Sequence, residues 1–179
     1  MKNNVYKVAL GGVMSALCLM CMFLAGIIPA LYLALPMISG VLMMIIADEV
    51  NTSWGLLTYV TVSILSLFFT FDKEAALIFI MFFGHYPLIK PYFEKIKFFP
   101  LRIAVKFAVY NVCILSFFGL TVYIFGFTAM LDEMNEFGKY GGLSLLILAN
   151  LFFPFYDLDL KICKLLYIKR LKPILKGRG

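Results

Sequence analysis

The stretch from Val8 to Ile28 reads VALGGVMSALCLMCMFLAGII and contains 21 consecutive residues without a charged side chain. About 20 apolar residues are what an α-helix needs to cross the hydrocarbon core of a bilayer. The stretch therefore predicts a membrane-spanning helix. It follows Lys2 and Lys7, as a signal peptide would, but it is long, lacks a clear small-x-small cleavage site and passes after Pro29 into a second apolar run.

Five more apolar runs follow along the chain, so that the predicted spans cover roughly residues 8–28, 30–47, 54–71, 75–89, 103–127 and 141–156. The fourth and sixth are short, and we expect Lys90 and the 157–164 stretch to extend them toward the head groups at their inner ends. The sequence thus predicts an all-α integral membrane protein with six transmembrane helices in one compact bundle. Residues 1–179 form a single domain in this prediction, and residues 160–179 form a basic amphipathic tail on the cytoplasmic surface.

Composition supports this class and excludes others. Apolar residues make up 63% of the 179 residues and charged residues only 15%, with a mean hydropathy of +0.97. Soluble domains are about 45–50% apolar, so a soluble globular domain is excluded. A 20.3 kDa chain of this kind has little room for a soluble catalytic or nucleotide-binding domain. Any ATP-driven work therefore needs a partner.

The basic residues indicate how the helices are oriented. If the N-terminus is cytoplasmic and all six runs span, 14 of the 16 lysines and arginines lie inside, and only Lys73 and Lys139 lie outside. This distribution follows the positive-inside rule, so we expect both termini to be cytoplasmic. Because the basic residues flank apolar segments, the net charge of +6 indicates membrane lipids as the partner and not nucleic acid.

Small residues form a strip on the first predicted helix. Gly11, Gly12, Ser15 and Ala16 make two overlapping pairs with a spacing of four, which lets another helix backbone approach closely. The other helix belongs either to this chain or to a partner protein. Both interpretations remain open from the sequence.

Two asparagines lie at similar depth on the fifth and sixth spans. At about 1.5 Å rise per residue, Asn111 lies about 13 Å from Arg102 at the inner side, and Asn150 lies about 13 Å from Gly141 at the outer side. In a core about 30 Å thick these two depths nearly coincide. The two amides either bond to each other and hold the helices together, or face a cavity and bind a ligand.

The string GHYPLIKPYFEK, residues 84–95, contains the only histidine, His85. Pro87 is expected to free a carbonyl one turn earlier and to kink the helix. A proton-relay or metal role for His85 has no evident second ligand, so a structural role is favoured. Asp157 and Asp159 either pair with Lys161, Lys164 or Lys90 and close the inner end of the bundle, or belong to a solvated helix end.

Signatures of catalysis are missing from the sequence. We find no GxxxxGK[ST] phosphate loop, no HExxH and no GxSxG. The four cysteines, Cys18, Cys21, Cys113 and Cys163, do not form a disulfide framework, and Cys18 and Cys21 are interpreted as apolar filler. We therefore predict neither enzymatic activity, nor a cofactor, nor a metal site.

Over nearly its whole length the chain resembles the S components of energy-coupling factor (ECF) transporters, the substrate-binding membrane subunits of prokaryotic vitamin and micronutrient importers. The resemblance rests on size, on six spans with both ends inside, on the first helix reading KVALGGVMSAL and on the short hairpin between the third and fourth spans. It implies a subunit of the prokaryotic plasma membrane that captures a small molecule outside and topples to release it inside. A transmembrane T component and two cytosolic ATPases would supply the partners, and Gly12 and Ala16 match the family's alanine-x-x-x-alanine docking surface.

The resemblance also implies a ligand pocket toward the outer side, lined by the fourth to sixth helices and the outer loops. The expected substrate-binding residues are Tyr32, Lys73, Glu74, Asn111, Tyr123 and Asn150. Aromatic stacking and a few hydrogen bonds in a largely apolar pocket would hold the substrate. One alternative is a six-span scaffold resembling the rod-shape family MreD, and another is a small lipid-modifying enzyme that uses His85 or the Asp157 and Asp159 pair.

Overall fold

The computed structural model describes residues 4–124, 126 and 140–173, and among these residues every element of secondary structure is helical. The elements in chain order are α1 (Asn4–Ile27), η1 (Pro29–Leu31), α2 (Ala34–Glu49), α3 (Thr52–Phe69), α4 (Lys73–Ile78), η2 (Phe79–Phe83), α5 (Tyr86–Phe93), α6 (Phe99–Gly119), η3 (Leu120–Ile124), α8 (Gly141–Leu166) and η5 (Tyr167–Leu171). Each of the six predicted apolar runs contains a helix. The all-helical prediction is therefore confirmed.

Five of these helical segments are long and apolar enough to cross a membrane, namely α1, α3, α4 through α5, α6 with the start of η3, and α8 with most of η5. The remaining helix, α2, has 16 residues. Segments α4, η2 and α5 form one path from Lys73 to Phe93, so the fourth apolar run extends past Lys90 as expected. Residues 160–171 of the predicted tail form the end of α8 and the whole of η5 without a break. The part of the tail beyond residue 173 lies outside the described residues.

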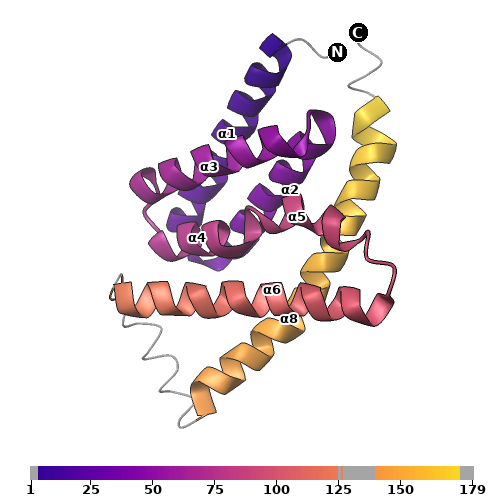
Figure 1. Ribbon diagram of the computed structural model, residues 1–179. Coiled ribbons are helices and arrows are strands. Elements are labelled where there is room, and N and C mark those ends of the chain that lie inside the picture. Colours follow the sequence, from indigo (N-terminus) through magenta and orange to yellow (C-terminus); the bar gives the residue numbers. More distant parts are fainter. Residues whose placement is uncertain (1–3, 125, 127–139, 174–179) are drawn as a thin grey trace.

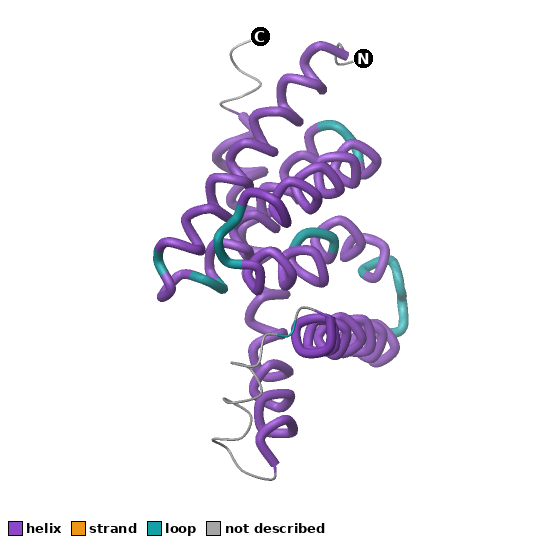
Figure 2. Tube along the Cα trace, turned by 90° about the vertical axis from the view of Figure 1, so that its left-hand side faces the viewer, coloured by secondary structure: helices purple, strands orange, loops and turns teal. Residues whose placement is uncertain are grey.

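Polar side chains cap the first turns of two helices, α3 and α4. Only Val50 and Asn51 separate α2 from α3, and the Asn51 side chain accepts a hydrogen bond of 2.9 Å from the backbone N–H of Trp54. Asp72 caps α4 in the same way, with a bond of 3.0 Å from the N–H of Ala75. Both side chains satisfy amides that a helix start leaves without a partner. Figure 2 shows how short the connecting loops are.

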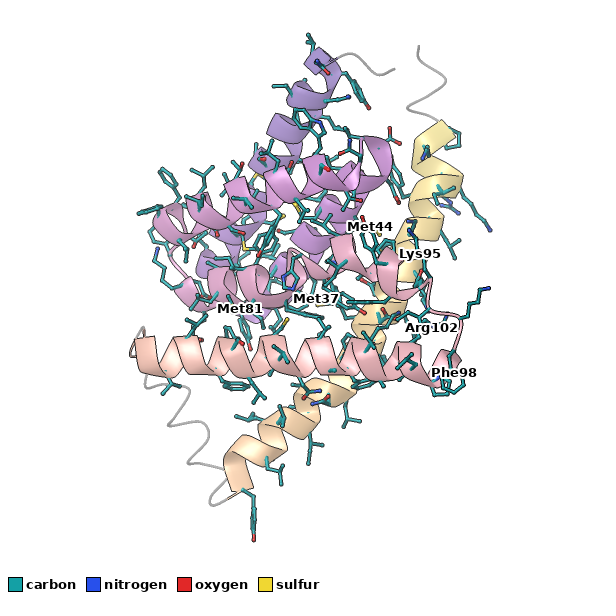
Figure 3. The ribbon with its side chains drawn as sticks, viewed as in Figure 1. Met37, Met44, Met81, Lys95, Phe98 and Arg102 are labelled. Atoms are coloured by element: carbon teal, nitrogen blue, oxygen red, sulfur yellow. The ribbon has the colours of Figure 1, made fainter. Side chains whose placement is uncertain are left out.

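Figure 1 shows α3, the α4–α5 segment and α6 lying one beneath the next, with α8 crossing α6 and continuing upward. Figures 1 and 2 place the start of α1 and the end of η5 at the same end of the molecule. In Figure 3, Met37, Met44 and Met81 lie within the body of the protein, whereas Lys95, Phe98 and Arg102 lie at one edge.

The α4–α5 segment is the centre of the fold. Within an apolar stretch of 18 residues in this segment 61% of the residues are buried, against 17–28% in the corresponding stretches of the other four long segments. Helix α2 is packed on several sides, since it contacts α1, α3, η2, α5 and α8. The remaining helices surround these two elements and expose many large apolar side chains. Such an apolar exterior is what a protein that lies in hydrocarbon presents.

Candidate functional site: an aromatic pocket

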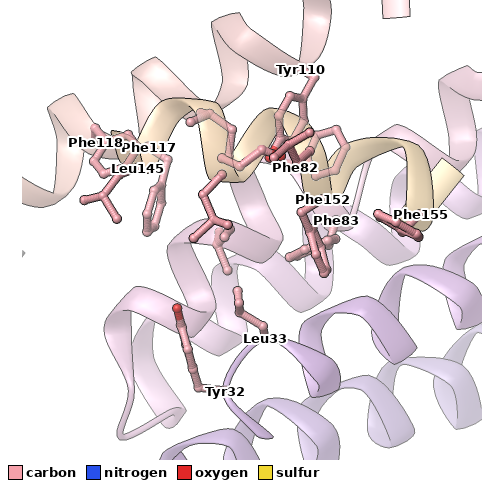
Figure 4. A pocket seen from close by; sticks show the side chains of 15 residues that line it. Tyr32, Leu33, Phe82, Phe83, Tyr110, Phe117, Phe118, Leu145, Phe152 and Phe155 are labelled. Atoms are coloured by element: carbon pink, nitrogen blue, oxygen red, sulfur yellow. The ribbon is translucent and has the colours of Figure 1, made fainter. Parts of the chain in front are cut away.

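A pocket of about 480 Å³ lies where the η1–α2 turn, the end of α4, η2, α6 and the first part of α8 meet (Figure 4). Its volume lies within the usual range of small-molecule sites. The lining residues are Tyr32, Leu33, Ile78, Phe82, Phe83, Tyr110, Ile114, Phe117, Phe118, Leu145, Leu148, Ala149, Leu151, Phe152 and Phe155.

The lining is apolar and rich in aromatic rings. None of these fifteen described lining residues carries a charge, and their only polar side-chain atoms are the hydroxyls of Tyr32 and Tyr110. The Tyr110 hydroxyl donates a hydrogen bond of 2.7 Å to the carbonyl of Ala149, which ties α6 to α8. Figure 4 shows the Tyr32 ring extending from the η1–α2 turn toward the other lining side chains, with its hydroxyl at the far end.

Phe82 is the centre of the aromatic wall of the pocket. Its ring lies 4.8 Å from that of Tyr86, 4.9 Å from that of Tyr110 and 5.6 Å from that of Tyr156, measured between centroids. Tyr110 in turn stacks on Phe153 at 4.6 Å. Aromatic pairs at these separations add stabilisation beyond the area they bury. The wall is therefore preformed by packing among four helical elements.

A π-helical turn places Phe82 and Phe83 at the pocket. In η2 the N–H of Gly84 bonds the carbonyl of Phe79 at 2.7 Å, which leaves the Ile80 carbonyl without its usual helical donor. The Tyr59 hydroxyl donates to that carbonyl at 2.8 Å, and His85 Nδ1 lies 3.3 Å from it. Side chains from outside the turn thus satisfy the carbonyl that the π-turn releases.

Pro87 frees the carbonyl of Phe83, as the sequence predicts, because proline has no N–H to donate one turn earlier. The hydroxyl of Tyr156 donates to this carbonyl at 3.5 Å. Gly40 of α2 packs at the same point, and a Cβ at Gly40 would lie only 2.5 Å from the Phe83 oxygen and 2.6 Å from the Tyr156 hydroxyl. Close contact among α2, η2 and α8 therefore depends on a glycine at this position.

The two asparagines bond to each other. Nδ2 of Asn111 donates to Oδ1 of Asn150 at 2.9 Å, and Nδ2 of Asn150 donates to Oδ1 of Asn111 at 2.9 Å. Each amide also donates to a backbone carbonyl one turn earlier, that of Phe107 or Leu146, at 2.9 Å. Of the two interpretations from the sequence, the bond between the helices is the one present in the structure. Neither asparagine lines the pocket.

A buried ionic network joins α5, α6 and α8 around Asp157. Lys90 Nζ lies 3.0 Å from Asp157 Oδ1, and Lys106 Nζ lies 3.0 and 2.9 Å from its two carboxylate oxygens. The hydroxyl of Tyr86 donates to Oδ1 at 2.7 Å. Side-chain exposure is 8% for each lysine and 13% for Asp157. The pairing of Asp157 with Lys90, one of the predicted alternatives, is present. The pairing of Asp157 with Lys106 was not predicted.

A second group of ion pairs ties the end of α2 to the last helical turns. Lys164 Nζ lies 2.9 Å from Asp48 Oδ1, and Lys172 Nζ lies 3.7 Å from Glu49 Oε1. Asp48 and Glu49 occupy the last turn of α2, where the partial negative charge of the helix end disfavours carboxylates. The two lysines offset this charge and hold the predicted basic tail against the bundle.

Lys73 and Glu74, predicted as substrate-binding residues, lie away from the pocket lining. Lys73 Nζ donates to the carbonyls of Leu67 and Thr70 at 2.8 and 2.7 Å, so that it satisfies the end of α3. Glu74 is half-buried in the first turn of α4. Tyr123 lies in η3, and its side chain lies outside the described residues. Among the five predicted residues whose side chains are described, only Tyr32 belongs to the lining of the pocket.

The structure divides the small-residue strip of α1 into two faces. Gly11 is buried, and a Cβ there would meet Thr58 Oγ1 at 3.6 Å. Ser15 is half-buried, whereas Gly12 and Ala16 are exposed. A Cβ at Gly12 would meet no atom within 4 Å. One face therefore packs inside the protein, and the other is open to a partner.

His85 packs between α3 and α6. Its ring centroid lies 6.0 Å from that of Tyr59, and its Nε2 lies 3.7 Å from the Cys113 sulfur. Within residues 4–124, 126 and 140–173, no group of three histidine, cysteine or acidic side chains is arranged to hold a metal ion. Asp159 does not join the Asp157 network, and its Oδ1 accepts instead from the Cys163 thiol at 3.8 Å.

The sequence interpretation expected aromatic stacking in a largely apolar pocket, but it named none of the residues that form the aromatic wall. The available signal was the FIMFF run at Phe79–Phe83, which concentrates aromatic rings just before Gly84 and Pro87, where a kink in the helix is expected. Comparisons with known proteins add nothing to this geometry: no protein-family model matches the sequence, no curated protein matches it, and no solved structure matches the fold.

Proposed function

We propose that this protein is a membrane-embedded substrate-binding subunit of an ECF-type importer, which takes up a vitamin-like or other small micronutrient. The observation that carries the proposal is the preformed aromatic pocket of about 480 Å³ between the η1–α2 turn, η2, α6 and α8. A scaffold needs tight helix packing but no pocket of this size. The absence of phosphate-loop and hydrolase motifs from the sequence agrees with a subunit whose energy comes from partners.

The orientation that we propose places the pocket in the outer half of the membrane. With the basic α5–α6 connection inside, α6 runs outward from Phe99, and the lining residues Ile114, Phe117 and Phe118 belong to its later turns. Residues Leu145 and Leu148 belong to the first turns of α8, which runs inward. A substrate would therefore bind near the outer surface and leave toward the cytoplasm.

Chemical labelling of single cysteines tests this orientation. In a version in which the four native cysteines are replaced by serine, Lys73→Cys should react with an impermeant maleimide in intact cells. Lys97→Cys should react only after the membrane is opened, because its loop carries the basic residues that favour the inner side. Labelling of Lys97→Cys in intact cells, at the rate seen for Lys73→Cys, would show that the six-span orientation is wrong.

Docking to a transmembrane partner is proposed for the exposed pair Gly12 and Ala16. Two small residues with a spacing of four let helix backbones approach closely, and leucine side chains would separate them. The double variant Gly12→Leu with Ala16→Leu is expected to lose at least about 90% of the partner recovered with the tagged protein from native membranes, since a lost helix contact worth ~1.4 kcal/mol lowers affinity tenfold. Mass spectrometry of the recovered subunits measures the loss.

A matched control is available on α6, where Ala104 and Ala108 are also exposed and also four residues apart. Replacing both by leucine should leave recovery of the partner unchanged. If both double variants keep their partners, the strip has no docking role. If ATPase subunits are never recovered with the native protein and no small molecule stabilises it, the scaffold alternative replaces the importer.

A further inference from the structure

Among the described residues that line the pocket, none could neutralise a charged ligand. Its described lining residues are all uncharged. Tyr86 lies between the Asp157 ionic network and the pocket wall, because its hydroxyl bonds Asp157 and its ring packs on Phe82. Lys90 and Lys106 are both bound to Asp157. A carboxylate or phosphate buried among apolar side chains without a counter-charge is strongly disfavoured. The main body of the ligand must therefore be neutral.

The lining also favours a flat ring over a flexible polar chain. Phe82, Phe83 and Tyr110 lie together on one side of the view with Phe152, and Phe117 lies with Phe118 on the other side (Figure 4). Aromatic side chains bind rings through stacked and edge-to-face contacts, which need no hydrogen-bond partner. The Tyr110 hydroxyl is used within the protein by its bond to Ala149. Ring contact is thus the main attraction that this pocket offers.

The mouth of the pocket runs along the outer face of α8. The lining residues Leu148, Leu151 and Phe155 are 64%, 62% and 71% exposed, and their spacing of three and four places them on one face of the helix. On a membrane-spanning helix an exposed apolar face lies against hydrocarbon. The pocket therefore opens sideways toward the bilayer, so a ligand can reach it from the hydrocarbon phase as well as from water.

We propose that the ligand of this pocket is a neutral, ring-containing apolar molecule that reaches it from the hydrocarbon phase of the membrane. This inference rests on the proposed function, because it names the substrate class of the same site. It excludes the carboxylate- and phosphate-bearing micronutrients that a water-filled, polar pocket would select. A lipid acyl chain shares the apolar chemistry but lacks the ring, so the experiment must separate the two.

A matched pair of probes tests the charge requirement. 2-Naphthylmethanol and 2-naphthoate share one ring system and differ in charge. Binding of each to the full-length purified protein in lipid nanodiscs is measured by equilibrium dialysis against empty nanodiscs, so that partition into lipid is subtracted. The neutral alcohol is expected to bind saturably and at least about tenfold more tightly than the carboxylate, which corresponds to 1.4 kcal/mol.

Two variants locate the bound probe. Ala149→Phe fills the pocket and should weaken saturable binding of 2-naphthylmethanol at least about tenfold, whereas Ala104→Phe, the same change on an exposed position of α6, should leave it unchanged. Leu145→Trp fills the same space from another position if the first variant fails to fold.

Several outcomes would overturn the inference. They are tighter or equal binding of 2-naphthoate, no saturable binding of the alcohol, equal binding by the filled and control variants, or a stoichiometric phospholipid that native mass spectrometry finds and that Ala149→Phe displaces. Failure of the importer proposal is a separate result, since it is read from the recovered ATPase subunits. A protein that docks to partners but prefers 2-naphthoate retains the importer function and refutes the neutral ligand.

Discussion

Asp157→Asn is expected to lower the free energy of unfolding by about 3–5 kcal/mol, the usual loss when one partner of a buried ion pair is removed. Two lysines with 8% exposed side chains depend on this one carboxylate, at distances of 2.9 to 3.0 Å. Asparagine keeps the shape of the side chain but removes the carboxylate that both ammonium groups contact, and Lys106 then retains only the longer pair with Glu94, at 3.8 Å. Reversible denaturation of the protein in mixed detergent micelles measures the change.

Asp159→Asn is the matched control, two residues along the same helix. Among the described residues the Asp159 carboxylate accepts only a long contact from the Cys163 thiol, so its replacement should change the free energy of unfolding by no more than about 0.5 kcal/mol. Adding Lys106→Met to Asp157→Asn should restore part of the lost stability, because it removes a buried cation whose one remaining pair, with the partly exposed Glu94, is long. Equal effects of the two aspartate substitutions would mean that water or lipid head groups reach the lysines and that the network contributes little.

Gly40→Ala is expected to destabilise the fold by about 1–3 kcal/mol, the range for overpacking a well-filled core. The new methyl group would lie 2.5 Å from the backbone oxygen of Phe83 and 2.6 Å from the hydroxyl of Tyr156, a fully buried side chain. The Phe83 oxygen is backbone of the π-turn, so relief of the contact requires α2 to move away from η2. Thermal unfolding in detergent is expected to show a lower midpoint.

Gly12→Ala provides the comparison, since a Cβ at Gly12 would meet no atom within 4 Å. There the higher helix propensity of alanine should stabilise the protein by up to about 1 kcal/mol. Adding Tyr156→Phe to Gly40→Ala should recover only part of the loss, because the Phe83 oxygen remains. A Gly40→Ala protein as stable as the native one would show that α2 approaches η2 less closely than the structure places it.

The helical segments could be predicted from sequence because each depends on a local pattern. A long uncharged run can satisfy its backbone hydrogen bonds in hydrocarbon only as a helix, and the charged or polar clusters at Asn51 and Asp72 mark where helices begin. Asn111 and Asn150 could be placed at one depth in advance because counting residues gives their depth, but only the structure showed that the two amides bond to each other. These inferences require only the rise of a helix and the thickness of a bilayer.

The pocket could not be predicted in the same way. Its lining residues are as far apart in sequence as Tyr32 and Phe155. The shape of the pocket also depends on the direction in which the η2 turn points the Phe82 ring. The polarity of a residue was a poor guide, because Lys73 satisfies the carbonyls at the end of α3 instead of a ligand. Similarly, Lys106 reads as one more charge near the inner surface, yet it is buried against Asp157.

The order of apolar and charged segments along the chain determined which residues form helices, and it indicated that the bilayer is the solvent, since both follow from short-range backbone and solvation requirements. Only the tertiary structure decided which side chains meet. Packing of α2 against η2 at Gly40, and of α8 across α6, depends on shape complementarity among side chains from several helices. That complementarity follows no local pattern, and for this reason the aromatic pocket and the Asp157 network became visible only in the folded protein.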